Sequence, residues 1–195
     1  SFSAHKLYGP KGIGALYVRR SRPRARLMPL LDGGGQEKGL RSGTLNVPGV
    51  VGFGAACALR MREMDAERVR LKGLRDRLRA RLAAVLDGVH ENGHPTRRLA
   101  GSLHLSLEGV DGDDLIRGME EGGLAVSSGS ACTAASLEPS HVLRAMGIPD
   151  NLARASIRFG LGRSTTEAEV DQAADCVARH VKALRSKQLI QETHR

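Results

Sequence analysis

The stretch Ser102–Gly123, "SLHLSLEGVDGDDLIRGMEEGG", decides the fold class. Its first eight residues alternate between apolar and polar side chains, a pattern that predicts a strand with one buried face. The following segment, Asp113–Gly123, indicates a short helix that ends at Gly122, a residue typical of helix C-termini. A strand followed directly by a helix is the building unit of an α/β protein, and we expect that fold class here.

Strands and helices are also expected to alternate in the rest of the chain. From about residue 47 to 86 the apolar residues recur at helical spacing, which predicts two helices broken near residues 64–66. Thr166 and Glu169 form a predicted capping box at the start of the last helix. The other expected elements are strands at 13–19, 124–128 and 155–162 and helices at 139–147 and 166–185. A Gly-rich first part and a compact later part predict two domains, 1–64 and 65–195.

Composition narrows the class of protein. The chain has 195 residues with 41% hydrophobic residues, which is enough for a folded core. We find no apolar run long enough to span a bilayer and no signal pattern, so we expect a cytoplasmic protein without a membrane partner. The three cysteines are widely spaced, without the spacing of zinc ligands, and we expect free thiols.

The net charge of +9 raises the question of a nucleic-acid partner. The densest basic run, residues 71–86, carries apolar residues at helical spacing, and its arginines are expected on the opposite, solvated face. With only 3% aromatic residues the chain has little to stack against bases. We therefore expect a surface helix and no direct nucleic-acid binding. The apolar positions of this run are Leu71, Leu74, Leu78, Leu82 and Val85.

Two motifs in the first part can carry chemistry. In "SFSAHKLYGPKG", residues 1–12, Lys6 lies at a junction between strand and loop, where a neutral amine can attack a carbonyl, although most lysines are surface charges. In "RSGTLN", residues 41–46, hydroxyls and backbone N–H groups beside glycine can hold a phosphate. The alternative for this second motif is a simple helix entry capped by Thr44 or Asn46.

Two more motifs lie in the second part. In "SSGSACTAAS", residues 127–136, Cys132 has only small neighbours, which predicts an accessible thiol; Cys57 and Cys176 fit buried structural positions. Arg158 interrupts an otherwise apolar strand, "ASIRFGLG". Its natural partner is a carboxylate, either from a substrate or from an internal salt bridge.

Taken together and in this order, these motifs resemble the cysteine desulfurases of the IscS/NifS type, in the class V aminotransferase superfamily. The resemblance covers nearly the whole chain and matches the C-terminal half of that family. It implies the fold type I of enzymes that depend on pyridoxal 5′-phosphate, with 1–64 as the end of the large, cofactor-binding domain. Residues 65–195 then form the small C-terminal α/β domain with the cysteine loop.

The resemblance also assigns cofactor residues. Lys6 matches the lysine that binds the cofactor covalently and later moves the substrate proton. Ser3 and His5 match residues near the cofactor phosphate, and Ala4 stands where the family often has glycine. Thr44 matches the threonine that reaches the phosphate in the neighbouring subunit, which implies a homodimer.

The implied reaction converts L-cysteine to L-alanine. Arg158 matches the arginine that binds the substrate carboxylate, and Cys132 matches the cysteine that becomes a persulfide. The implied partners are sulfur-acceptor proteins and an iron–sulfur scaffold protein, with uses in iron–sulfur cluster assembly and tRNA thiolation. Cys132 is in addition a candidate transient iron–sulfur ligand with that scaffold.

Other functions stay open at this point. The family's N-terminal half, which carries further cofactor contacts, has no counterpart in this sequence. A selenocysteine lyase-like enzyme is one alternative, and the long cysteine loop argues against it. A non-catalytic module for dimerisation or partner binding is another, and the presence of Lys6, Thr44, Cys132 and Arg158 together argues against it.

Overall fold

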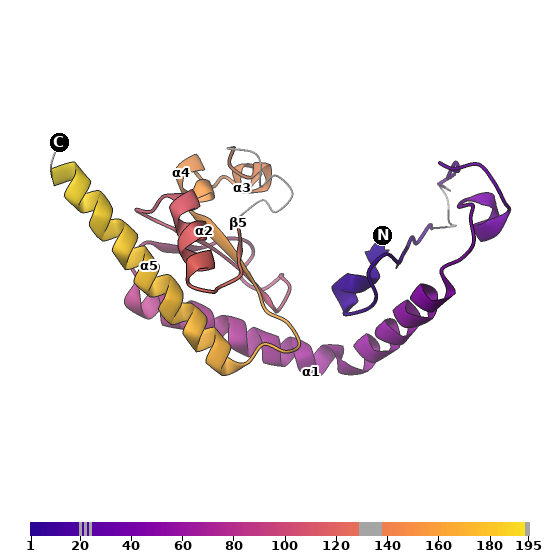
Figure 1. Ribbon diagram of the computed structural model, residues 1–195, viewed down its shortest axis with the longest axis horizontal. Coiled ribbons are helices and arrows are strands. Elements are labelled where there is room, and N and C mark those ends of the chain that lie inside the picture. Colours follow the sequence, from indigo (N-terminus) through magenta and orange to yellow (C-terminus); the bar gives the residue numbers. More distant parts are fainter. Residues whose placement is uncertain (20, 22, 24, 129–137, 194–195) are drawn as a thin grey trace. The chain divides into compact units, whose positions relative to one another are not determined.

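The computed structural model describes residues 1–19, 21, 23, 25–128 and 138–193, with backbone alone for 191–193. The chain divides into two compact units, Ser1–Asp65 and Ala66–Arg195, called here the N-terminal and the C-terminal unit. Both contain helices and strands, as expected of an α/β protein (Figure 1). None of the helices in the described ranges combines the length and the apolar composition needed to cross a membrane.

The N-terminal unit contains little regular structure. Strand β1 (Phe2–Ser3) pairs with β2 (Gly14–Ala15) in antiparallel register, and the 3₁₀ helices η1 (Ala4–Leu7) and η2 (Gln36–Gly39) lie in the loops. The expected strand over 13–19 is therefore wrong in length. A strand extends only as far as a neighbour donates to it, and β1 gives β2 two partner residues.

Small residues let the β1–β2 connection pack on helix α1 (Val47–Val85). A side-chain carbon built on Gly9 would lie 3.1 Å from the Cβ of Ala56, and one built on Gly52 would lie 2.6 Å from Pro10. Ala56 is buried, and Ala4 is fully buried. The turn that carries Lys6 is thus held against α1 by contacts that larger side chains would not allow.

Helix α1 is one helix, and the expected break at 64–66 is wrong. The segment around 55–72 contains no glycine or proline and is rich in Ala, Leu, Met, Glu and Arg, all strong helix formers. The two units nevertheless separate at Asp65, inside this helix.

The C-terminal unit is built on a four-stranded antiparallel sheet in the order β3-β4-β6-β5. The strands are β3 (Val89–Glu91), β4 (Ser102–Leu107), β5 (Ser127–Ser128) and β6 (Ser156–Gly160). The helices besides α1 are α2 (Gly112–Glu121), α3 (His141–Ala145), α4 (Asp150–Arg154) and α5 (Glu167–Thr193). The predicted strands over 102–109 and 155–162 are found, with ends that differ from the expected ones by at most two residues.

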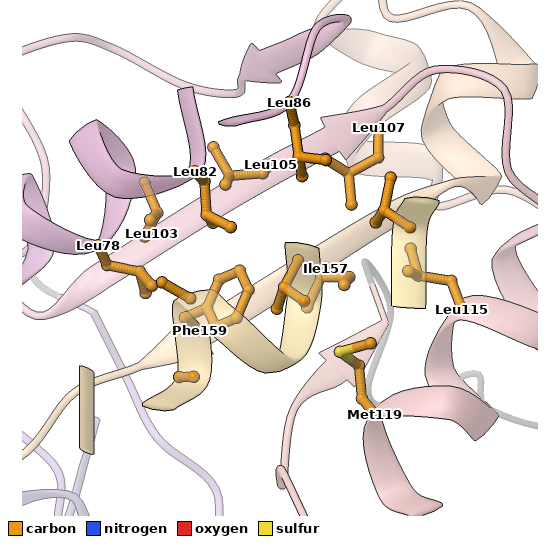
Figure 2. Close-up of a cluster of buried hydrophobic side chains, with 14 of the residues drawn as sticks. Leu78, Leu82, Leu86, Leu103, Leu105, Leu107, Leu115, Met119, Ile157 and Phe159 are labelled. Carbon is orange, nitrogen blue, oxygen red and sulfur yellow. The ribbon is translucent and has the colours of Figure 1, made fainter. Parts of the chain in front are cut away.

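One face of this sheet forms the core. Leu103 and Leu105 of β4 stand opposite Phe159 and Ile157 of β6, and all four are 5% exposed or less. Figure 2 shows leucines of α1 above this face, and Leu115 and Met119 of α2 beside it. Each such burial contributes about 1.5–3 kcal/mol. The alternation in Ser102–Leu107 therefore places its leucines in the core and its Ser and His side chains on the opposite face.

The helix ends confirm two local predictions. Glu169 accepts from the Thr166 N–H at 2.7 Å while Thr166 Oγ1 accepts from the Glu169 N–H at 3.2 Å, which is the predicted capping box. Helix α2 ends at Gly122, as predicted, and Gly123 follows in the left-handed region with φ of 73°. The Leu124 N–H then donates to the Met119 carbonyl at 2.9 Å, which completes a Schellman motif.

Two expected elements are shorter than the sequence indicates. Strand β5 covers Ser127–Ser128 instead of 124–128, because Leu124 is used to close helix α2. Helix α3 begins at His141 instead of residue 139, because Ser140 has the extended backbone of an N-cap with ψ of 123°.

The basic run in α1 differs from its expectation at two positions. Val85 is 49% exposed and Leu86 takes its place in the core, while Arg75 is buried and pairs with Asp76 at 2.8 Å. Neighbouring arginines of α1 bind α5: Arg77 forms two bonds of 2.7 Å with Asp171. Ion pairs from this run, those of Arg77 and Arg81, therefore link α1 to α5 within the C-terminal unit.

Candidate functional site

The turn around Lys6 is a fixed platform in the N-terminal unit. The Ala4 N–H donates to the Ile13 carbonyl at 3.0 Å, and the Gly9 N–H donates to the Ala4 carbonyl at 2.9 Å. Tyr8 closes η1 in the left-handed region with φ of 62°, an uncommon backbone for a residue other than glycine. Ala4 is buried beneath the turn, so that His5 and Lys6 are exposed above it. The amine of Lys6 is thus presented to a ligand from a well-braced backbone.

The loop before Thr44 is constrained as well. Glu37, Lys38 and Gly39 follow one another with positive φ, between 49° and 77°. Two successive non-glycine residues in this region are strained, and such strain is concentrated at functional sites. Further along, the Gly43 N–H donates to Gln36 Oε1 at 3.2 Å. Thr44 is exposed directly after this hydrogen-bonded segment.

Arg158 lies on the face of the C-terminal sheet that is turned away from the core. Its neighbours Ile157 and Phe159 are buried, whereas Arg158 is exposed. It forms no hydrogen bond or ion pair with any other residue that the structure describes. Of the two partners considered for this arginine, the internal salt bridge is therefore not found among the described residues.

Arg158 has two polar neighbours across the sheet. It pairs with His104 on β4 and with Ser127 on β5, in antiparallel register. Side chains of directly opposed residues lie on the same face, with Cβ atoms about 4.5–5.5 Å apart. Burial, and then the charge of Arg158, lower the pKa of His104 from 6.5 to about 4. The imidazole is consequently neutral at pH 7.

Cys132 lies outside the described residues, since the structure does not describe 129–137. The chain on both sides of that segment is held in place. Strand β5 ends at Ser128, and on the other side Arg144 binds Glu138 at 3.1 Å and Asp150 at 2.8 Å. No cluster of three or more potential metal-ligating side chains occurs among the residues the structure describes.

The other two cysteines occupy helices. Cys176 is buried in α5 beside Val177, as its helical spacing predicted. Cys57 of α1 is half-buried, so the prediction of a buried position holds only in part. Cys57 therefore serves as a matched thiol for testing Cys132.

The structure brings some of the expected site residues together and not others. Ser3 to Lys6 lie on one turn, and Thr44 belongs to the same unit. Arg158 belongs to the C-terminal unit, and His104 and Ser127 beside it were missed by sequence reasoning. The signal for His104 was present: in "SLHLSLEG" the alternation puts it opposite the leucines, on the face that Arg158 shares.

The sequence matches the aminotransferase class-V family over residues 1–173, a span that includes both motif groups. The chain belongs to the aminotransferase class-V family. It is 57% identical over 185 residues to "Cysteine desulfurase IscS" of Anaeromyxobacter sp. (strain Fw109-5), a match covering 95% of this chain and 45% of the relative. It is 56% identical to "Cysteine desulfurase, mitochondrial" of Arabidopsis thaliana, covering 95% of this chain and 40% of the relative.

The fold of this chain matches that of a solved structure over most of its length. A chain described as "NIFS-LIKE PROTEIN" superposes with a TM-score of 0.79 at 35% identity, covering 93% of this chain and 46% of that one. The mixed α/β fold of this family member is thereby established over part of the relatives' chain. This chain spans less than half the length of these relatives.

The class V family uses pyridoxal phosphate, an aldehyde with a phosphate arm. The described residues fit the chemistry of that group. Lys6 presents an exposed primary amine suited to an aldehyde, on a turn braced by the buried Ala4. Ser3 and Thr44 carry hydroxyls suited to a phosphate.

Proposed function

We propose that this chain is the C-terminal part of a cysteine desulfurase that converts L-cysteine to L-alanine and transfers the sulfur through Cys132. The observation that carries the proposal is 56–57% identity to cysteine desulfurases across 95% of the chain. The family match over residues 1–173 extends across the positions of Lys6, Thr44, Cys132 and Arg158. Retention of all four functional groups is expected of an enzyme and is not needed in a purely structural module.

In this proposal the two units have different tasks. The N-terminal unit is the end of the large domain of a fold type I enzyme, with Ser3, Ala4, His5 and Lys6 beside the cofactor. The C-terminal unit is the small domain, which carries the substrate arginine and the cysteine loop. Thr44 reaches the cofactor phosphate of a second subunit, so the working enzyme is a homodimer.

Lys6 is the proton carrier. When bound, pyridoxal phosphate supplies the electron sink that stabilises negative charge at the substrate Cα. The Lys6 amine, released when L-cysteine takes its place, removes the proton from Cα and returns a proton later in the cycle. The braced turn supports this role because it holds the backbone from which the Lys6 side chain extends.

Arg158 holds the substrate. Its guanidinium is exposed and has no acidic partner among the described residues, so a substrate carboxylate can form the paired hydrogen bonds that a guanidinium favours. This contact holds L-cysteine by its carboxylate end.

Cys132 is the nucleophile. Its thiolate attacks the sulfur of the substrate, a sulfur–sulfur bond forms, and the Cβ–sulfur bond breaks. The electron pair of the broken bond stays on Cβ, which takes a proton to become the methyl group of alanine. The persulfide left on Cys132 passes its outer sulfur to acceptor proteins, including an iron–sulfur scaffold, with which Cys132 can share a cluster transiently.

The test uses the enzyme with the N-terminal portion that its relatives possess, loaded with pyridoxal phosphate. Alanine and sulfide are measured from L-cysteine in the presence of a thiol reductant. We expect Cys132→Ser to lower sulfide release by at least about 1,000-fold and to leave the cofactor absorbance band intact. Lys6→Ala should abolish that band.

Cys57→Ser is the matched control, because it removes another free thiol of the same chain. It should leave both the band and sulfide release unchanged. Sulfide release at the wild-type rate by Cys132→Ser would overturn the persulfide role. Absence of both the band and sulfide release in the wild-type enzyme would favour a non-catalytic module.

A further inference from the structure

A second hydrogen-bond donor lies beside Arg158. His104, Arg158 and Ser127 form one row across β4, β6 and β5, because each is directly opposed to the next in the antiparallel register. The row lies on the face opposite the leucine core. A guanidinium, an imidazole and a hydroxyl can all donate hydrogen bonds.

The hydrogen bonding of His104 determines which ring nitrogen carries the proton. Asn92 Nδ2 lies 2.8 Å from His104 Nδ1 and donates to Ser106 Oγ, also at 2.8 Å. An amide nitrogen only donates, so Nδ1 of His104 accepts. The neutral ring therefore carries its hydrogen on Nε2. The low pKa of His104, about 4, agrees with a neutral ring.

The Nε2–H group is left without a partner. Nε2 of His104 is buried and has no hydrogen-bond partner in the part of the chain that the structure describes. A buried donor without an acceptor costs about 1–3 kcal/mol, and such groups in folded proteins call for an explanation. A pocket of about 130 Å³ lies beside the ring, bounded also by Asn92 and Arg98. Arg98 already binds Glu91 and the carbonyls of Asn92 and His94, whereas Arg158, directly opposite His104 across the strand pair, has no acidic partner among the described residues. A donor without a partner beside such a guanidinium suits a carboxylate.

We propose that His104 is a substrate-binding residue whose Nε2–H donates to the same carboxylate that Arg158 binds. Ser127, at the other side of Arg158, lies in position to supply a third donor. Asn92 acts as a positioning residue, because its amide fixes the tautomer in which Nε2 carries the hydrogen. This inference rests on the proposed function, in which Arg158 binds the carboxylate of L-cysteine.

The experiment compares variants of the cofactor-loaded enzyme in steady-state turnover of L-cysteine. His104→Phe keeps a ring of similar size and removes the donor, and we expect KM to rise at least about 10-fold with kcat within about threefold. His104→Gln, whose amide can donate from a comparable position, should restore most of the loss. His90→Gln is the matched control, since His90 is an exposed histidine of the same sheet, and it should leave KM unchanged.

A ligand without a carboxylate separates binding from general damage. Cysteamine lacks the carboxylate of L-cysteine, so its inhibition constant should be the same in wild type and in His104→Phe. A rise of both constants together, or an unchanged KM for L-cysteine in His104→Phe, would overturn the inference. An unchanged KM in Arg158→Ala would instead overturn the proposed role of Arg158, so the two failures are distinguishable.

A spectroscopic readout covers the case in which His104→Phe does not fold. In ¹⁵N-histidine-labelled enzyme the His104 ring should show a proton on Nε2 at pH 7, and addition of L-alanine should shift the Nε2 resonance. A proton on Nδ1, or no shift at saturating L-alanine, would contradict the proposal.

Discussion

The two units differ in how they cover their apolar side chains. In the C-terminal unit the leucines of α1 and β4 close over one face of a sheet, and Leu82 and Leu103 are fully buried. In the N-terminal unit Leu30 is 97% exposed and Met28 is 86% exposed. The C-terminal unit has a core of its own, whereas several large apolar side chains of the N-terminal unit are exposed. The C-terminal unit thus covers its own apolar side chains, and the N-terminal unit does not.

The largest expected effect on folding comes from expressing the two units separately. We expect residues 66–195 alone to unfold in one cooperative transition, because their core lies within the segment. We expect residues 1–65 alone to show no cooperative transition, because a pair of two-residue strands is not stable by itself. Circular dichroism during urea titration checks both. A cooperative transition in 1–65 would break the comparison.

A pair of leucine truncations gives the next largest effect. Leu82→Ala should lower the free energy of unfolding by about 3 kcal/mol, because Leu82 is fully buried and its loss leaves a cavity. Leu30→Ala, the same change in the N-terminal unit, should stay within about 0.5 kcal/mol. Equal effects in urea unfolding would show that the exposed leucine is covered in solution.

The smallest expected effect is a pH dependence of stability. It concerns His104, which lies on the face of the sheet that is turned away from the core. The pKa of His104 is 6.5 in an ordinary setting and about 4 in the folded chain, so between these values the unfolded chain binds more protons. Stability is therefore complete above pH 6.5 and falls as the pH drops toward 4. We expect a loss of about 2 kcal/mol, after allowance for solvent screening of a partly exposed ring.

His104→Gln provides the control for this pH effect. A glutamine does not titrate, so unfolding free energies measured from pH 7 to pH 4 should fall less steeply in the variant. The difference between the two curves isolates His104 from the carboxylates that titrate in the same range. Parallel curves would mean that the ring is as well solvated in the folded chain as in the unfolded one.

Much of the fold was predictable where the deciding interactions are local. The alternation in Ser102–Leu107 and the capping box of Thr166 and Glu169 depend on residues a few positions apart, and both are found. The length of β2 was not predictable, because it depends on the two residues that β1 offers as partners. The length of β5 was missed because Leu124 is used to close helix α2. The unbroken α1 was missed because a composition change near residue 65 does not interrupt backbone hydrogen bonds.

In the candidate site, too, local sequence motifs were readable and contacts between distant segments were not. Lys6, Thr44, Cys132 and Arg158 were proposed from motifs, each of which lies in a short stretch of sequence. His104 was missed because the argument for its binding role depends on two residues distant in sequence. Arg158 lies opposite it on another strand, and Asn92 sets its tautomer. Where Cys132 lies relative to these residues stays a prediction.

The sequence alone determined the family, the alternating strands and helices, and the set of candidate reactive side chains, because motifs and periodicity are properties of neighbouring residues. The tertiary structure decided which face of the sheet each side chain occupies and which side chains are opposed. Strand register brings His104, Arg158 and Ser127 into one row, and register is set by pairing across the sheet between segments far apart in the chain.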